Sequence, residues 1–200
     1  RIVGEEQYGE YSLLLSQCNL VVALGFGWFN QAQLRYYSKY RSKNYFKSVQ
    51  IKGLLYSLIF CLIIISLLVY YQSLSKKIWI VSIITITSLG YFNYIKIFYQ
   101  AKLLPKRIIS LTSAQSVMSI LIPLVLIFFL DSNAIVLLFG VGISFLLSTI
   151  IISKHDLKSL LININNYKVG KNNNLIKKWF IYGGPLSIWF AVGLALSFLD

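Results

Sequence analysis

The chain has 200 residues, of which 57% are hydrophobic and only 12% are charged, and its mean hydropathy is +0.69. Such a composition excludes a water-soluble globule, because too few polar groups remain to cover an apolar core. The net charge of +13 does not indicate a nucleic-acid-binding protein, since the basic residues fall between long uncharged runs instead of forming one contiguous cluster. The composition therefore predicts a protein that lies in the lipid bilayer.

Six uncharged apolar runs are long enough to cross about 30 Å of hydrocarbon as helices of about 20 residues. We predict an all-α fold, a polytopic membrane helical bundle of about six transmembrane helices. Tyr and Trp residues cluster at the ends of these runs, where we expect them to lie in the headgroup region. In chain order the runs cover residues 11–34, 53–71, 78–95, 108–130, 133–153 and 179–199.

The first run carries three amides on one face. Asn19, Asn30 and Gln33 recur at helical spacing together with Phe26 and Tyr37, which predicts that this face points into the bundle. The amides are candidates either for lining a polar path or for simple hydrogen bonds to a neighbouring helix. Two further amide or basic positions follow near the end of the third run, at Asn93 and Lys96. Lys96 is a candidate for the same path, although its side chain can also extend to the interface.

Two prolines interrupt later runs. Pro123 lies in the fourth run, and Pro185 follows two glycines in the sixth. Gly and Pro mark bends in transporters whose helices move, so both prolines are candidate hinges, although helix packing also accounts for such residues.

The basic residues are distributed on one side only. All of the 19 except Arg1, Lys76 and Lys77 lie in the loops after the first, third and fifth runs, and all of the 6 acids except Asp156 lie on the opposite side. Because basic loops are retained in the cytoplasm, these three loops are predicted to be cytoplasmic. The localisation expected is a bacterial inner membrane, with several passes.

The longest connection, residues 154–178, is rich in Asn and Lys and is predicted to be a cytoplasmic loop between two bundles. Residues 1–153 would then hold most of an N-terminal bundle (five helices), and residues 179–200 the first helix of a C-terminal one. The sequence begins with Arg1 and stops directly after an apolar run, so we expect a fragment of a longer protein.

Few residues are available for chemistry. The chain has one histidine, two cysteines and six carboxylates, with no cluster at metal-ligand spacing and no Gly-rich phosphate loop. Cys18 and Cys61 each lie inside an apolar run and are expected to be small buried hydrophobes. We therefore predict no catalytic residues, no metal site and no cofactor, and we expect that the protein is not an enzyme.

Three segments resemble the Wzx-type polysaccharide-biosynthesis flippases, within the multidrug/oligosaccharidyl-lipid/polysaccharide exporter superfamily. Residues 4–12 carry G-x-x-x-Y-G-x-Y-S, which in that family leads into the second helix. Residues 28–37, WFNQAQLRYY, are similar to the end of that helix. Residues 182–186, YGGPL, resemble the start of the seventh. The resemblance covers the whole chain in topology, as helices two to seven of a two-bundle transporter.

This resemblance implies a transporter that moves an undecaprenyl-pyrophosphate-linked oligosaccharide from the cytoplasmic to the periplasmic leaflet by alternating access. Such a step belongs to the biosynthesis of O-antigen or capsule, and polysaccharide polymerases and glycosyltransferases would be functional partners. Cations near the cytoplasmic mouth would hold the pyrophosphate, for which Arg35 and Lys96 are the candidates. Asn19, Asn30, Gln33 and Asn93 would line the path of the glycan, and membrane lipids would surround the lipid tail.

Two other classes stay open. A drug or small-solute exporter of the same superfamily would more often couple transport to an acid inside the membrane, and the six runs contain no Asp or Glu. A membrane-bound glycan polymerase or ligase would need a large external loop with catalytic groups, whereas the predicted external loops are short.

Overall fold

Six α-helices follow one another along the chain in a computed structural model that describes residues 4–42, 46–130, 133–161 and 173–197, without the side chains of residues 155–161, 173 and 197. Each helix is long and apolar enough to cross a membrane, which confirms the predicted fold of six spanning helices. The helices are α1 (Glu5–Tyr40), α2 (Phe46–Tyr71), α3 (Lys76–Ala101), α4 (Pro105–Phe129), α5 (Ala134–Leu161) and α6 (Asn173–Ser197).

The helices extend beyond the apolar runs, most clearly on the basic side. α2 begins at Phe46 although the run that predicts it begins at residue 53. Hydropathy marks only the part of a helix that meets hydrocarbon, while backbone hydrogen bonding continues into the interface. For the same reason α5 and α6 reach into the predicted loop at residues 154–178, of which residues 162–172 lie outside the described part.

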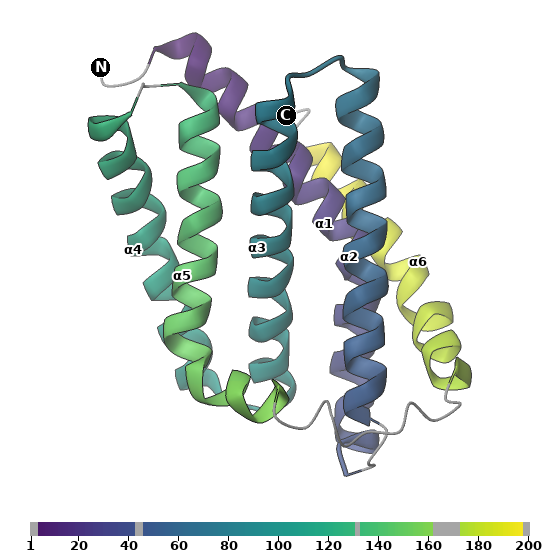
Figure 1. The fold of residues 1–200 in the computed structure, drawn as a ribbon. Helices are drawn as coiled ribbons and strands as arrows, with labels where there is room; N and C mark the ends of the chain where they lie inside the picture. Colours follow the sequence, from purple (N-terminus) through teal and green to yellow (C-terminus); the bar gives the residue numbers. More distant parts are fainter. Residues whose placement is uncertain (1–3, 43–45, 131–132, 162–172, 198–200) are drawn as a thin grey trace.

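Successive helices run in opposite directions, and Figure 1 shows that α1, α3 and α5 all end on its lower side. The structure therefore places the ends of α1, α3 and α5, with the basic residues near them, on one face of the bundle, as the distribution of charge predicts. We call this face the basic end, and its cytoplasmic location remains a prediction.

α1 is the central helix. It packs against α6, α3 and α2, while α5 packs between α3 and α4. The largest fully buried side chains of α1 are Phe26 and Phe29. α4 lies at the periphery, where Leu111 and Pro123 are its only buried residues among those described. The other side chains of α4 are at least partly exposed, and many are large and apolar, as expected for a lipid-facing helix.

Glycines allow the helices to approach closely. A methyl group added at Gly25 of α1 would collide with Cys61 of α2, and one at Gly140 of α5 would lie 2.8 Å from the Cα atom of Pro123 in α4. Lipid tails are as apolar as the helices, so close backbone contact between small residues takes the place of a hydrophobic driving force. Gly25 and Gly140 are thus sites of helix packing.

Hydrogen bonds join several pairs of helices in the described part of the chain. The Thr85 hydroxyl in α3 lies 2.9 Å from the Val81 carbonyl of its own helix and 3.3 Å from the Leu138 carbonyl in α5, so its hydrogen bond is shared between the two. The Trp79 indole in α3 donates to Ser66 Oγ in α2 at 3.2 Å. Gln7 Oε1 of α1 accepts from the backbone N–H of Ala134 at 3.0 Å and so caps the first turn of α5. These contacts fix pairs of helices that the uniform apolar pattern leaves interchangeable.

The aromatic residues at the ends of the runs divide into two groups. Tyr70 and Tyr71 are 85% and 89% exposed, as expected for interfacial rings. Tyr99 and Trp179 are fully buried against neighbouring helices, so these two rings do not face lipid, and their depth in the membrane remains a prediction. A ring at the end of a span can face either lipid or a neighbouring helix, and sequence position does not distinguish the two.

Candidate functional site

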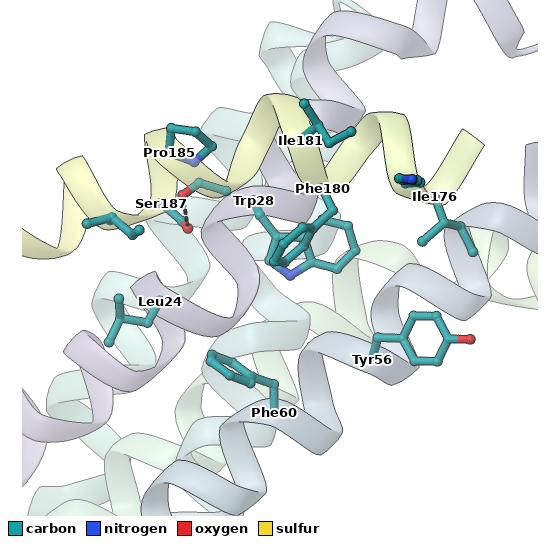
Figure 2. Close-up of a pocket in the computed structure, with 12 residues that line it drawn as sticks. Leu24, Trp28, Tyr56, Phe60, Ile176, Phe180, Ile181, Pro185 and Ser187 are labelled. Atoms are coloured by element: carbon teal, nitrogen blue, oxygen red, sulfur yellow. Dashed lines mark hydrogen bonds between the residues drawn. The ribbon is translucent and has the colours of Figure 1, made fainter. Parts of the chain in front are cut away.

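An apolar groove of about 1000 Å³ lies between α1, α2 and α6. Leu24 and Trp28 of α1 form its floor (Figure 2), and Phe180 of α6 packs edge-on against Trp28 with ring centroids 5.5 Å apart. Tyr56 and Phe60 of α2 form the opposite wall, and both are about half exposed. Because the lining is almost entirely hydrocarbon and aromatic, the groove suits an extended apolar chain.

One end of the groove is cationic. Lys177 of α6 belongs to the lining and is exposed, close to the start of that helix at the basic end. Arg35 of α1 lies outside the groove lining but is also exposed, and its guanidinium carbon lies 4.1 Å from the centre of the Tyr182 ring of α6. Such a cation–π contact holds the guanidinium in place while its N–H groups remain free to bind an anion.

The basic end contains no carboxylate among the side chains that the structure describes. The described acids, Glu5, Glu6 and Glu10, all lie in the first turns of α1, at the other end. Several cations lie over aromatic rings, such as Lys102 Nζ at 4.0 Å from the centre of the Phe98 ring. The basic end therefore has a strongly positive potential that favours anionic groups at the membrane surface.

The predicted amide face of α1 points into the bundle over the C-terminal half of this helix. Gln33 is 0% exposed, and Phe26 and Tyr37 on the same face are also buried. Asn30 is half-buried, and its Oδ1 atom is buried without a hydrogen-bond partner. Asn19 is half-buried near the middle of the helix.

The remaining predicted residues are spread over three helices. Asn93 and Lys96 of α3 are half-buried, and no described hydrogen bond joins them to the amides of α1. Pro123 is buried against Gly140, whereas Pro185 is exposed beside the groove. Each proline lies inside a continuous helix, and a hinge at either position remains a prediction.

A second polar group, which the sequence did not reveal, lies at the junction of α1, α2 and α6. Gln50 of α2 is 3% exposed and its Nε2 atom has no hydrogen-bond partner, and the same holds for Nε1 of the fully buried Trp179 of α6. Both amide atoms of Gln33 are likewise without a partner. Burial of an unpaired polar group costs about 1–3 kcal/mol, so three such groups in one region need an explanation.

Aromatic rings surround Trp179, and two of them lie one helical turn from Gln33 and Gln50. The Trp179 ring lies 5.9 Å from Phe29 and 5.8 Å from Phe46, measured between centroids, and it stacks on Tyr36. Gln33 follows Phe29 by one helical turn, and Gln50 follows Phe46 by one turn, so each amide shares a face with a ring that contacts Trp179. We refer to Gln33, Gln50 and Trp179 as the buried polar cluster.

Comparison with protein-family models, curated proteins and solved structures finds no match. The resemblance to flippases therefore stands on its three segments alone. What the structure establishes is a multi-pass membrane protein with six candidate spans.

The chemistry available follows from the residue types at the groove and the buried polar cluster. Among the described side chains, no three His, Cys, Asp or Glu residues lie close enough to hold a metal ion. The polar groups are amides, an indole N–H and cations, which bind ligands without reacting with them. Gln50 was not predicted as a site residue because it falls in a segment predicted to be a basic loop. Trp179 was not predicted as one because a tryptophan at the end of an apolar run was expected to lie at the membrane interface.

Proposed function

We propose that the protein translocates a lipid-linked oligosaccharide across the plasma membrane of a bacterium, from the cytoplasmic to the periplasmic leaflet. The observation that carries this proposal is the groove between α1, α2 and α6, whose lining is apolar except for Ser187 and the cationic Lys177 at the basic end. A ligand that fits it has a long hydrocarbon tail and an anionic head. A polyprenyl pyrophosphate has both.

The parts of such a substrate match different parts of the site. The isoprenoid tail would lie in the groove against Trp28 and Phe180, where it remains open to the bilayer. Lys177 and Arg35 would bind the pyrophosphate, because guanidinium and ammonium groups form short, charge-assisted hydrogen bonds to phosphate oxygens. The glycan would follow the amide face of α1, where amide groups can replace hydrogen bonds to water.

Alternating access would supply the movement, with Pro123 and Pro185 as candidate hinges. The proposed substrate is an undecaprenyl-pyrophosphate-linked oligosaccharide for O-antigen or capsule, and the role is transport without catalysis. Polysaccharide polymerases and glycosyltransferases would supply or consume the same substrate. A drug exporter is less well supported, because drugs handled by such exporters are often cations and the groove lining includes the cationic Lys177.

Arg35→Ala tests the proposal. We expect this substitution to abolish translocation, measured as surface polysaccharide in cells and as transfer of fluorescent lipid-linked oligosaccharide across proteoliposomes. Insertion into the membrane should be unchanged, because Arg35 is exposed at a helix end. Arg41→Ala is the matched control, since it removes an equal charge from an exposed position just beyond the same helix and should preserve transport.

Unchanged transport by the Arg35→Ala protein would remove this residue from the site. If the Arg41→Ala protein lost as much activity as the Arg35→Ala protein, only the general positive charge of the basic end would matter. Transfer of lipophilic cations in place of lipid-linked glycans would favour the drug exporter.

A further inference from the structure

The buried polar cluster has a composition that matches a sugar. Gln33 offers an amide N–H₂ and a carbonyl oxygen, Gln50 a second amide N–H₂, and Trp179 an indole N–H, and these atoms have no partner within the described protein. Sugar hydroxyls donate and accept hydrogen bonds, and the C–H faces of sugars pack on aromatic rings such as Phe29 and Phe46. None of these side chains is charged, so the cluster suits a neutral polar ligand better than a phosphate.

We propose that Gln33, Gln50 and Trp179 form a binding site for one sugar residue of the transported glycan, and that this site opens when α6 moves away from α1. The proposal rests on the proposed function and adds the residues that would recognise the glycan. In the present arrangement side chains fill the site, since Gln33 and Trp179 are 0% exposed. The ligand therefore needs a second arrangement of the helices.

α6 is the element whose displacement would open the site. It packs along α1 and far less on α2, and its face with Ile181 and Ile188, which lines the groove, is exposed. Its contact with α1 includes small residues, with Ser187 against Gly27 and Gly183 against the backbone of Trp28, besides aromatic rings such as Phe180 on Trp28. Separation of this one pair of helices would uncover Trp179 and Gln33 together.

A substitution that distinguishes a binding role from a structural role is Gln33→Leu. A structural amide would be hydrogen-bonded, and its loss would destabilise the fold. An unpaired amide kept for a ligand behaves in the opposite way, because its replacement by an apolar group of similar size removes a buried polar group. We expect an unchanged or raised melting temperature together with a loss of transport of about tenfold, the factor that corresponds to one hydrogen bond to a buried group.

Gln31→Leu is the matched control for transport. Gln31 lies on the same helix and is half-buried, but it is not on the face that carries Phe29 and Gln33. We expect the Gln31→Leu protein to transport normally. A Gln33→Leu protein that melts lower, or that transports normally, would overturn the proposal.

Thiol labelling tests the site without relying on transport. In a background of Cys18→Ala and Cys61→Ala, Gln33→Cys should react with a water-soluble maleimide in inside-out vesicles, whereas Val21→Cys, at an equally buried apolar position of α1, should not. Undecaprenyl-pyrophosphate-linked oligosaccharide should slow the reaction at position 33, and undecaprenyl pyrophosphate without a glycan should not.

Each outcome of the labelling experiment decides the proposal. If position 33 labels as slowly as position 21, the site does not open. If the bare lipid protects as well as the glycosylated lipid, or if neither protects, the cluster is not a sugar site. If glycan protection is seen but the unsubstituted protein fails to translocate lipid-linked oligosaccharide, the sugar site stands and the proposed function fails.

Discussion

Gly183 and Gly184 are neighbours in α6, but a methyl group added to each would meet different surroundings. At Gly183 it would collide with the Trp28 carbonyl oxygen of α1 and lie 2.7 Å from the Trp28 Cα atom. At Gly184 the nearest atom is Cε1 of Phe180, at an ordinary contact distance of 3.9 Å. Comparison of the stabilities of the Gly183→Ala and Gly184→Ala proteins therefore measures how much the close approach of α6 to α1 at Gly183 matters.

The size of the effect follows from two terms. Alanine is favoured over glycine inside a helix by about 0.5–1 kcal/mol, and this gain is common to both variants. Overpacking costs about 1–3 kcal/mol, and it applies only at Gly183, where the obstacle is backbone that cannot rotate away. We expect the Gly184→Ala protein to be slightly more stable than the unsubstituted protein, and the Gly183→Ala protein to be less stable than the Gly184→Ala protein by about 1–3 kcal/mol.

The measurement is the free energy of unfolding in mixed micelles, obtained by titration with a denaturing detergent and followed by circular dichroism. Protease sensitivity of the segment before α6 reports on whether this helix is the one displaced. Equal stability of the two alanine proteins would refute the reasoning, because it would mean that α6 does not approach α1 at Gly183.

Two further predictions concern the rest of the bundle. Thr85→Val should lower the free energy of unfolding by about 0.6 kcal/mol, the average for a hydrogen bond between membrane helices, whereas Thr87→Val should have little effect. The reason is that the Thr85 hydroxyl reaches Leu138 of another helix besides Val81 of its own, while the Thr87 hydroxyl donates to carbonyls of its own helix. Equal losses in the two proteins would contradict this. Alkaline phosphatase fused after Ser73 should be active and fused after Leu103 inactive, since these turns lie at opposite ends of the bundle and the basic end is predicted to be cytoplasmic. The reverse pattern would invert the orientation.

Much of the fold was predictable because the bilayer imposes a strict rule on the chain. Backbone groups in hydrocarbon must be hydrogen-bonded within their own segment, so each long apolar run has to be a helix. The helix ends were less predictable, as with Phe46 at the start of α2, because a helix continues into the interface where hydropathy no longer marks it.

The candidate site was predictable only in part. Helical spacing predicted the inward face of α1 and thus the burial of Gln33, since period alone decides which residues share a face. The groove and the buried polar cluster depend on residues of three helices that are far apart in sequence, such as Gln50 and Trp179. No local pattern connects them.

The sequence by itself determined that the chain has six spanning helices, how they alternate in direction and which end of the bundle is basic, because hydrophobic length and charge act on each segment separately. The tertiary structure decided which helices are neighbours, with α1 in the centre and α6 against it. Helices that are apolar all round can pair in many ways in lipid. Close contacts such as Gly183 on Trp28, and hydrogen bonds such as Thr85 to Leu138, select one arrangement, and only in that arrangement do a groove and a buried polar cluster exist.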